Sequence, residues 1–215
     1  MKDKSERFWN KLSTNYDKKA KDQTFEQLLN RSPKYLQRDD VVLDFACATG
    51  LYSFEFASHV KEIQAFDSSS EMIVIAKDQA NKNGNANITF SHTTLFDKKY
   101  QEGSFDTIMA FNILLYFEDT EKILNRMNKL LKPKGLIITS TACLGEKRTF
   151  IGIVSGSVIF ILKKLGILPY LKFYKIPELK EVITNCGFKS IESDILIEKP
   201  AIEYFIVAQK SDARI

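Results

Sequence analysis

The sequence is poor in the residues that build disulfide frameworks and zinc sites. Its three cysteines, Cys47, Cys143 and Cys186, are an odd number, lie far apart and form no CxxC pair. Only two histidines, His59 and His92, could add imidazole ligands. Disulfide scaffolds and structural zinc sites depend on closely spaced sets of such residues. The composition therefore argues against both, and we expect no metal site.

Glycine and proline are also scarce, with 9 and 5 among 215 residues. Charged residues make up 27% of the chain and hydrophobic residues 44%, which is unlike a disordered polar chain or a fibrous repeat. A chain of this length buries roughly 70% of the surface that its unfolded form exposes. We therefore expect one domain that spans residues 1–215 and has a substantial core.

Long apolar runs and a strong excess of one charge are missing too. The longest apolar stretch, residues 150–162, ends at Lys163 and Lys164 and is shorter than the ~20 residues of a membrane-spanning helix. Lys and Arg number 31 against 27 Asp and Glu, an excess too small to indicate a nucleic-acid partner. Residues 1–7 are charged and lack the apolar stretch of a signal peptide. We expect a cytoplasmic protein with no transmembrane segment and no nucleic-acid partner.

Short β-branched apolar runs alternate with amphipathic segments along the chain. The runs predict strands at residues 41–45, 62–66, 88–91, 105–110, 136–141, 188–193 and 204–209. The segments between them predict helices at residues 51–58, from Ser68 to Gly84, at 119–131, and from Pro177 to Gly187. Ser68 and Glu71 have the spacing of a capping box. This alternation predicts an α/β fold on a mostly parallel sheet, preceded by a helical cap in residues 1–36.

The strongest local feature is the stretch from Asp44 to Gly50, where an apolar strand runs into small residues and then a helix. Such a turn can present backbone N–H groups and a helix N-terminus to an anionic group, although small residues also occur where a helix packs closely on a strand. Asp67 stands at the expected end of the second strand. An acid at this position can accept hydrogen bonds from both hydroxyls of a ribose. Alternatively, its negative charge stabilises the N-terminus of the helix that follows. Together these residues fit an adenosine-containing ligand. NAD and S-adenosylmethionine both remain candidates at this point.

The motif from Asp44 to Gly50 resembles the first motif of class I S-adenosylmethionine-dependent methyltransferases, an Asp followed by three alternating glycines. Further segments are similar to the small-molecule branch that includes the ubiquinone and menaquinone biosynthesis methyltransferases. They are Phe8-Trp9-Asn10 to Tyr16-Asp17, Gly103-Ser104-Phe105-Asp106, residues 113–119, Lys132-Pro133-Lys134-Gly135 and Tyr204-Phe205-Ile206-Val207-Ala208. The resemblance implies a Rossmann-like fold with a seven-stranded, mostly parallel sheet and an antiparallel last strand. It also implies S-adenosylmethionine as cofactor and S-adenosylhomocysteine as product.

Carried over position by position, the resemblance implies a set of cofactor-binding residues. The loop would frame the methionine end, Asp67 would hold the ribose, and the residues after the third and fourth strands would line the adenine and the sulfonium. The implied residues are Tyr16, Asp44, Ala46, Cys47, Gly50, Asp67, Ser68, Met72, Thr94, Leu95 and Asn112.

Several positions depart from the family pattern. Ala46 and Ala48 replace two of the three glycines, and each added methyl narrows the approach to a ligand and disfavours positive φ. Thr94 is neutral where the family usually has an acid, and Leu115-Tyr116 replaces a common His pair. These changes keep open a rival hypothesis, a catalytically degenerate protein that binds S-adenosylmethionine or S-adenosylhomocysteine. An NAD-dependent oxidoreductase is a more distant alternative.

Methyl transfer is an in-line displacement, so the protein mainly has to hold the nucleophile and exclude water. Tyr16 and Tyr116 are the candidate catalytic residues, and Cys143 and Glu146 are further polar groups expected near the methyl. Neither histidine is expected to reach the acceptor.

The resemblance places a substrate cap, or lid, in residues 145–176. Its apolar side chains indicate a small apolar acceptor, although a segment that merely packs on the sheet is an equal alternative. Its lysines, among them Lys172 and Lys175, could contact anionic lipid headgroups at a membrane surface or form a solvated face. The sequence sets neither the acceptor atom nor the oligomeric state.

Overall fold

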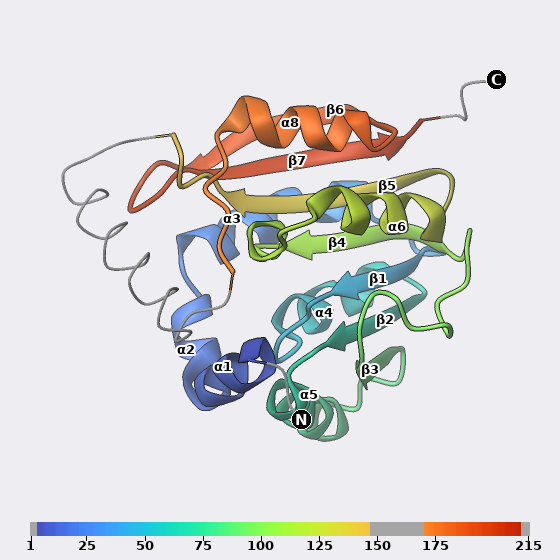
Figure 1. Cartoon of the computed structure of the whole chain (residues 1–215). Coiled ribbons are helices and arrows are strands. Elements are labelled where there is room, and N and C mark those ends of the chain that lie inside the picture. The colour runs from blue at the N-terminus through green and yellow to red at the C-terminus, as the bar shows by residue number, and fades with distance from the viewer. Residues whose placement is uncertain (1–3, 147–169, 212–215) are drawn as a thin grey trace.

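The computed structural model describes residues 4–146 and 170–211, and it contains a seven-stranded sheet with helices on both faces (Figure 1). The strand order is β3-β2-β1-β4-β5-β7-β6. The strands are β1 (Val41–Phe45), β2 (Glu62–Asp67), β3 (Ile88–His92), β4 (Phe105–Phe111), β5 (Leu131–Ala142), β6 (Phe188–Ile197) and β7 (Glu203–Lys210). β1 to β5 pair in parallel, and β7 runs antiparallel to both β5 and β6. The predicted α/β fold with an antiparallel last strand is confirmed.

Two apolar layers cover the sheet. One lies under α6 (Thr120–Leu130) and α8 (Ile176–Asn185), which cross the same face of the sheet (Figure 1). The other lies under α3 (Gln23–Arg31), α4 (Leu51–Phe56) and α5 (Ser70–Asn83). β1 and β4 are buried on both faces, which explains why their sequences are nearly continuous apolar runs.

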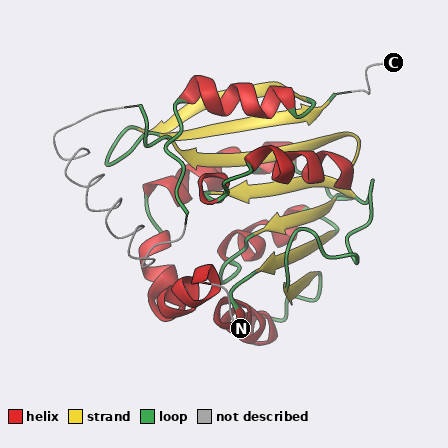
Figure 2. Cartoon of the chain, viewed as in Figure 1, coloured by secondary structure: helices red, strands yellow, loops and turns green. Residues whose placement is uncertain are grey.

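The N-terminal helices lie at the end of the sheet to which β1, β2 and β4 point (Figure 2). They are α1 (Lys4–Leu12) and α2 (Tyr16–Ala20), joined by the short helix η1 (Ser13–Asn15). Asn10 fastens α1 to α5: its Oδ1 accepts from the Ser69 hydroxyl (2.6 Å), and its Nδ2 donates to Ser70 Oγ (3.2 Å). The predicted helical cap therefore sits over the carboxyl ends of the parallel strands.

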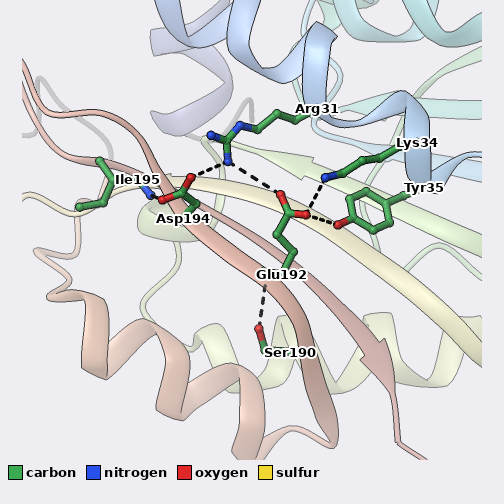
Figure 3. A network of polar contacts seen from close by, with 7 residues as sticks. All are labelled: Arg31, Lys34, Tyr35, Ser190, Glu192, Asp194 and Ile195. Carbon is green, nitrogen blue, oxygen red and sulfur yellow. Dashed lines mark hydrogen bonds and ion pairs between the residues drawn. The ribbon is translucent and has the colours of Figure 1, made fainter.

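A polar network joins the chain's first third to its last strand pair (Figure 3). Glu192 of β6 accepts from Lys34 (2.6 Å) and from the Tyr35 hydroxyl, both in η2 (Pro33–Tyr35). Arg31, at the end of α3, donates to Asp194 at 2.8 Å. Exposed pairs of this kind each contribute at most about 1 kcal/mol, so the network mainly fixes how α3 lies on β6.

The ends of the predicted elements are partly confirmed and partly corrected. Gly84 (φ 67°) and Gly187 (φ 80°) follow α5 and α8 in the left-handed conformation that ends a helix. The predicted cap at Ser68 is wrong, because Ser69 caps α5 and its hydroxyl accepts from the Met72 N–H at 3.2 Å. β5 is also longer than predicted, because it begins before Gly135 and passes through the Lys132-Pro133-Lys134 bend.

The predicted lid, residues 145–176, lies mostly outside the described residues, which resume at Tyr170. Its two ends are paired, since the Gly145 N–H donates to the Tyr174 carbonyl at 2.9 Å. The buried Tyr174 hydroxyl donates to Thr120 Oγ1 at 2.6 Å. Within the described ranges, no helix is long and apolar enough to cross a membrane.

Candidate active site

The loop between β1 and α4 takes an unusual backbone path. Ala46 (φ 59°), Ala48 (φ 50°) and Gly50 (φ 86°) all adopt the left-handed conformation, and they alternate with Cys47 and Thr49. The Cys47 N–H donates to the Phe66 carbonyl at 2.9 Å, which ties the loop to β2. A left-handed alanine costs roughly 1–2 kcal/mol, so the surrounding contacts must hold this path.

The structure explains why the third position keeps its glycine. A Cβ at Gly50 would come within 2.6 Å of the Phe90 ring, a distance that real Cβ atoms essentially never show. The loop therefore tolerates methyl groups at Ala46 and Ala48 but has no room for one at Gly50. The two departures from the family pattern keep the left-handed turns that the glycines would make.

Asp67, at the end of β2, lies against this loop. Its Oδ2 accepts from the Ala48 N–H at 3.0 Å, and its Oδ1 accepts from the Ser69 N–H at 2.7 Å. Burial raises the pKa of this carboxyl, while the two backbone N–H groups act in the opposite direction. A carboxylate offers about four acceptor sites, so Asp67 can also accept hydrogen bonds from ribose hydroxyls.

Asp44 lies beneath the same loop on β1 and is fully buried. The Ser53 hydroxyl of α4 donates to its Oδ2 at 2.5 Å. Burial raises the pKa of Asp44 to about 7 and the neighbouring Asp67 adds to the rise, although Ser53 opposes it. Asp44 thus links β1 to α4 and places a second carboxyl close to the loop.

The N-terminal cap supplies one wall of the site. Tyr16 is half-buried at the start of α2, and burial together with the nearby Asp67 raises the pKa of its phenol. Asp17 accepts hydrogen bonds from the Thr49 hydroxyl and from Gln79 Nε2, which fixes α2 to the loop and to α5. A phenol with a raised pKa stays protonated near neutral pH, so Tyr16 suits hydrogen-bond donation better than proton abstraction.

A second group of candidate site residues follows β4. Asn112 adopts the left-handed conformation (φ 52°), and its N–H donates to the Ser140 carbonyl at 2.9 Å, which leaves its side chain exposed. Tyr116, in η4 (Leu114–Tyr116), packs edge-to-face against Trp9 at 5.2 Å between ring centroids. Burial and the charge of Glu203 raise the pKa of Tyr116. The two candidate catalytic phenols lie close enough to interact electrostatically, and both favour the protonated form.

The residues expected on the adenosine side differ in how exposed they are. Met72 is buried in α5, and Leu95 packs in the core beside α6, whereas Thr94 is exposed. Ser68 offers its carbonyl to His92 Nε2 at 3.1 Å. These four residues remain predictions for the adenosine side. His59 is exposed at the end of η3 (Ala57–His59).

The polar groups expected near the methyl have other partners. Glu146 Oε1 accepts from the Ile176 N–H at 2.5 Å, so it holds the start of α8. Cys143 is buried, and burial raises the pKa of its thiol to about 12, which keeps it unreactive near neutral pH. In residues 4–146 and 170–211, no group of three or more His, Cys, Asp or Glu side chains could hold a metal ion.

Sequence reasoning missed several residues that shape the site. Asn10, Asp17, Ser53 and Glu203 act through tertiary contacts that no local spacing announces. Glu203 is the first residue of the otherwise apolar β7, but its sequence position does not reveal that the carboxyl is buried.

An α/β sheet of this order, with a carboxylate-anchored loop after β1, defines the class of Rossmann-like nucleoside-cofactor proteins. The sequence profile of the family described as "Methyltransferase domain" matches residues 36–164. The chain belongs to this family, and S-adenosylmethionine is the cofactor of its site.

Among curated proteins, the ubiquinone biosynthesis O-methyltransferase of Coxiella burnetii is 27% identical over 152 residues. The match covers 70% of this chain and 64% of that relative, so the chain matches less than two thirds of the relative's length.

Two solved structures show the same fold. An S-adenosylmethionine-dependent methyltransferase from Methanosarcina mazei has a TM-score of 0.69 and 20% identity, covering 83% of this chain and 95% of that one. The Haemonchus contortus phosphoethanolamine N-methyltransferase 2, solved with S-adenosyl-L-methionine, has a TM-score of 0.72 and 16% identity, covering 87% of this chain and 53% of that one.

The donor set of this chain fits the cofactor. Asp67 has free acceptor positions for ribose hydroxyls, and the left-handed loop turns its backbone at the carboxyl end of β1.

Proposed function

We propose that this chain transfers the methyl group of S-adenosylmethionine to a small, largely apolar acceptor by in-line displacement, releasing S-adenosylhomocysteine. The observation that carries the proposal is the position of Asp67, which joins the end of β2 to the left-handed loop after β1. This is where a ribose hydroxyl pair is held in open α/β sheets. Membership of the methyltransferase family supports the same reaction class.

The bound cofactor supplies an electrophilic methyl group on a sulfonium. The chain's own residues bind and orient: Asp67 would hold the ribose, and Asn112 would lie beside the reacting centre. Tyr16 would cover the site and donate its phenolic hydrogen. Holding the two reactants in line and excluding water supplies most of the acceleration such a reaction needs.

An apolar acceptor is supported by the rings on the walls of the site. Trp9 of α1 packs against Tyr116 of η4, and Phe117 stacks on Phe45 with 5.6 Å between centroids. Curated relatives are named for O-methylation in ubiquinone biosynthesis, which supports a hydroxyl on an apolar molecule as the acceptor group.

The rival hypothesis is a protein that binds the cofactor without turnover. It is motivated by Ala46 and Ala48, yet both residues take the left-handed conformation that glycine would take there. The loop geometry therefore supports a working site more than a degenerate one.

Release of S-adenosylhomocysteine tests the proposal against a panel of quinols, phenols, fatty acids and lipids, with short RNA and DNA as the contrasting group. We expect methylated product from at least one small apolar hydroxyl compound and none from nucleic acid. The Asp67→Ala variant should lose this turnover at low cofactor concentration. Turnover confined to nucleic acid would contradict the apolar-acceptor hypothesis, and cofactor binding without any turnover would favour the degenerate protein.

A further inference from the structure

A buried carboxyl stands at the carboxyl edge of the sheet, away from the cofactor loop. Glu203 is the first residue of β7, is 5% exposed, and pairs with Ala142 of β5. Among the described residues, Oε1 of Glu203 and Oγ of the buried Ser140 make no hydrogen bond of normal geometry, although the side chains of Ser140 and Asn112 lie close enough to the carboxyl to stabilise its charged form. Buried polar atoms without partners are rare in folded proteins and call for an explanation such as a ligand.

The strand register places Glu203 at the end of β5 that lies beside the carboxyl end of β4. Side chains alternate along β7, so Glu203 shares a face with Phe205 and Val207, which pack in the layer beneath α3 and α4. Ser140 pairs with Phe111, the residue directly before Asn112. Both Ser140 and Asn112 lie close enough to Glu203 to influence its ionisation.

Burial raises the pKa of Glu203 to about 8, and Asp22 at the start of α3 adds to the rise. Ser140 and Asn112 act in the opposite direction. The other titratable groups that interact with Glu203 are Tyr52 of α4, Tyr116 of η4 and Cys143 after β5. All three are protonated near neutral pH, because burial raises each of their pKa values.

Tyr52 connects this carboxyl to the cofactor site. Its pKa is raised by burial and by interactions with Tyr16, Asp22, Glu203 and Asp44, so the ring lies between the two regions. It packs against Phe111 with 4.5 Å between ring centroids. Glu203 therefore belongs to a neighbourhood continuous with Asp44 and Tyr16.

We propose that Glu203 is the general base of the methyl transfer, with Oε1 facing the hydrogen of the acceptor's hydroxyl group. The inference rests on the proposed function and on its hydroxyl-bearing acceptor, and it adds the residue that takes the proton. In the step, the acceptor oxygen forms a bond to the methyl carbon as the bond from that carbon to sulfur breaks. The sulfonium becomes a neutral thioether, and the hydroxyl proton passes to Glu203 Oε1.

The other candidate bases suit this role less well. Tyr16 and Tyr116 have raised pKa values and hold their protons. His92 is exposed and bonded to Ser68 on the adenosine side. A general base works best when its pKa lies near the working pH, and such a base typically contributes 10²–10⁴-fold.

Two phenols of different acidity test the proposal directly. At pH 8, 4-methylphenol is still protonated and needs a base, whereas 4-nitrophenol is largely ionised and does not. We expect Glu203→Gln to lower kcat with 4-methylphenol by about 100-fold or more and with 4-nitrophenol by less than about tenfold. Glu26→Gln, an exposed change on α3, is the matched control and should leave both rates unchanged.

The pH profile supplies a second readout that a purely structural role would not move. With 4-methylphenol, wild-type kcat should rise with pH and level off above about 8, and Glu203→Gln should lack this limb. Ser140→Ala should shift the limb to higher pH, because it removes a neighbour that favours the charged carboxylate. Asp22→Asn keeps a residue suited to capping α3 and should shift the limb to lower pH, because it removes a negative charge.

Cofactor affinity measured by calorimetry on the same samples separates the outcomes. If Glu203→Gln loses the same rate with both phenols, the general-base role of Glu203 is wrong, while the proposed methyl transfer stands. Unchanged rates and an unchanged limb in that variant would overturn the general-base role as well. If the wild-type protein binds cofactor but methylates neither phenol, the hydroxyl acceptor and the base both fail, while the cofactor site stands.

Discussion

Asp67 Oδ2 accepts a hydrogen bond from the Ala48 N–H at 3.0 Å, and this contact joins the end of β2 to the loop after β1. The carboxylate therefore has two tasks at one place. It holds the left-handed loop, and it keeps acceptor positions for a ribose.

Replacing Asp67 with alanine should weaken S-adenosylhomocysteine binding by about 1.5–3 kcal/mol, because charge-assisted hydrogen bonds to the ribose are lost. Asp67→Asn should lose less, since one oxygen can still accept from the backbone. Calorimetric titration measures the change, and Asp78→Asn, an exposed change on α5, serves as control. Equal affinity of wild type and Asp67→Ala for S-adenosylhomocysteine would contradict the hypothesis that Asp67 binds the ribose.

Ala48→Gly should leave the fold intact and change cofactor affinity by less than about tenfold, because the chain already accommodates this methyl group. Glycine removes the strain of the left-handed alanine, which stabilises the folded state. It also gives the unfolded chain more conformational freedom, which destabilises the folded state, so the free energy of unfolding should change by less than about 1 kcal/mol. Ala80→Gly, inside α5, lacks that relief and should destabilise by roughly 0.5–1 kcal/mol. A glycine variant that binds cofactor while wild type does not would favour the degenerate protein.

Gly50→Ala and Gly84→Ala separate backbone strain from steric conflict. Both positions have positive φ, but only at Gly50 would the new Cβ meet another residue, the Phe90 ring at 2.6 Å. We expect Gly84→Ala to cost about 1–2 kcal/mol and Gly50→Ala at least about 1 kcal/mol more. Urea unfolding of both variants measures the difference, and equal losses would show that the Phe90 ring moves aside freely.

The stability of the protein without ligand should fall as pH rises from about 5 to about 8. Asp44 and Glu203 have folded-state pKa values of about 7 and about 8, above the roughly 4 of unfolded carboxyls. In this window the folded state binds more protons than the unfolded state, so each group lowers the free energy of unfolding by up to about 1.4 kcal/mol per pH unit. Urea unfolding at several pH values should show a shallower decline for Glu203→Gln and an unaltered one for Glu26→Gln. Stability that rises across this window would contradict the assigned titrations.

The order of the elements and the cofactor loop could be predicted from the sequence, because both depend on local patterns. Apolar runs predict β1 and β4, and Asp67 at the end of β2 is the acid expected to bind a ribose. The cap of α5 lies one residue beyond the predicted Ser68, because Ser68, Ser69 and Ser70 are chemically alike and no local pattern shows which hydroxyl accepts from the Met72 N–H. The pH-sensitive carboxyl of Glu203 could not be predicted, since its environment comes from α3, β4 and β5 at once.

Competitive calorimetry with S-adenosylmethionine, S-adenosylhomocysteine and NAD tests the central claim most directly. The Asp67 contact and the family assignment predict one site for which the two sulfur nucleosides compete. The affinity of this site for both should fall in Asp67→Ala. Tight binding of NAD with no response to either sulfur nucleoside would contradict it.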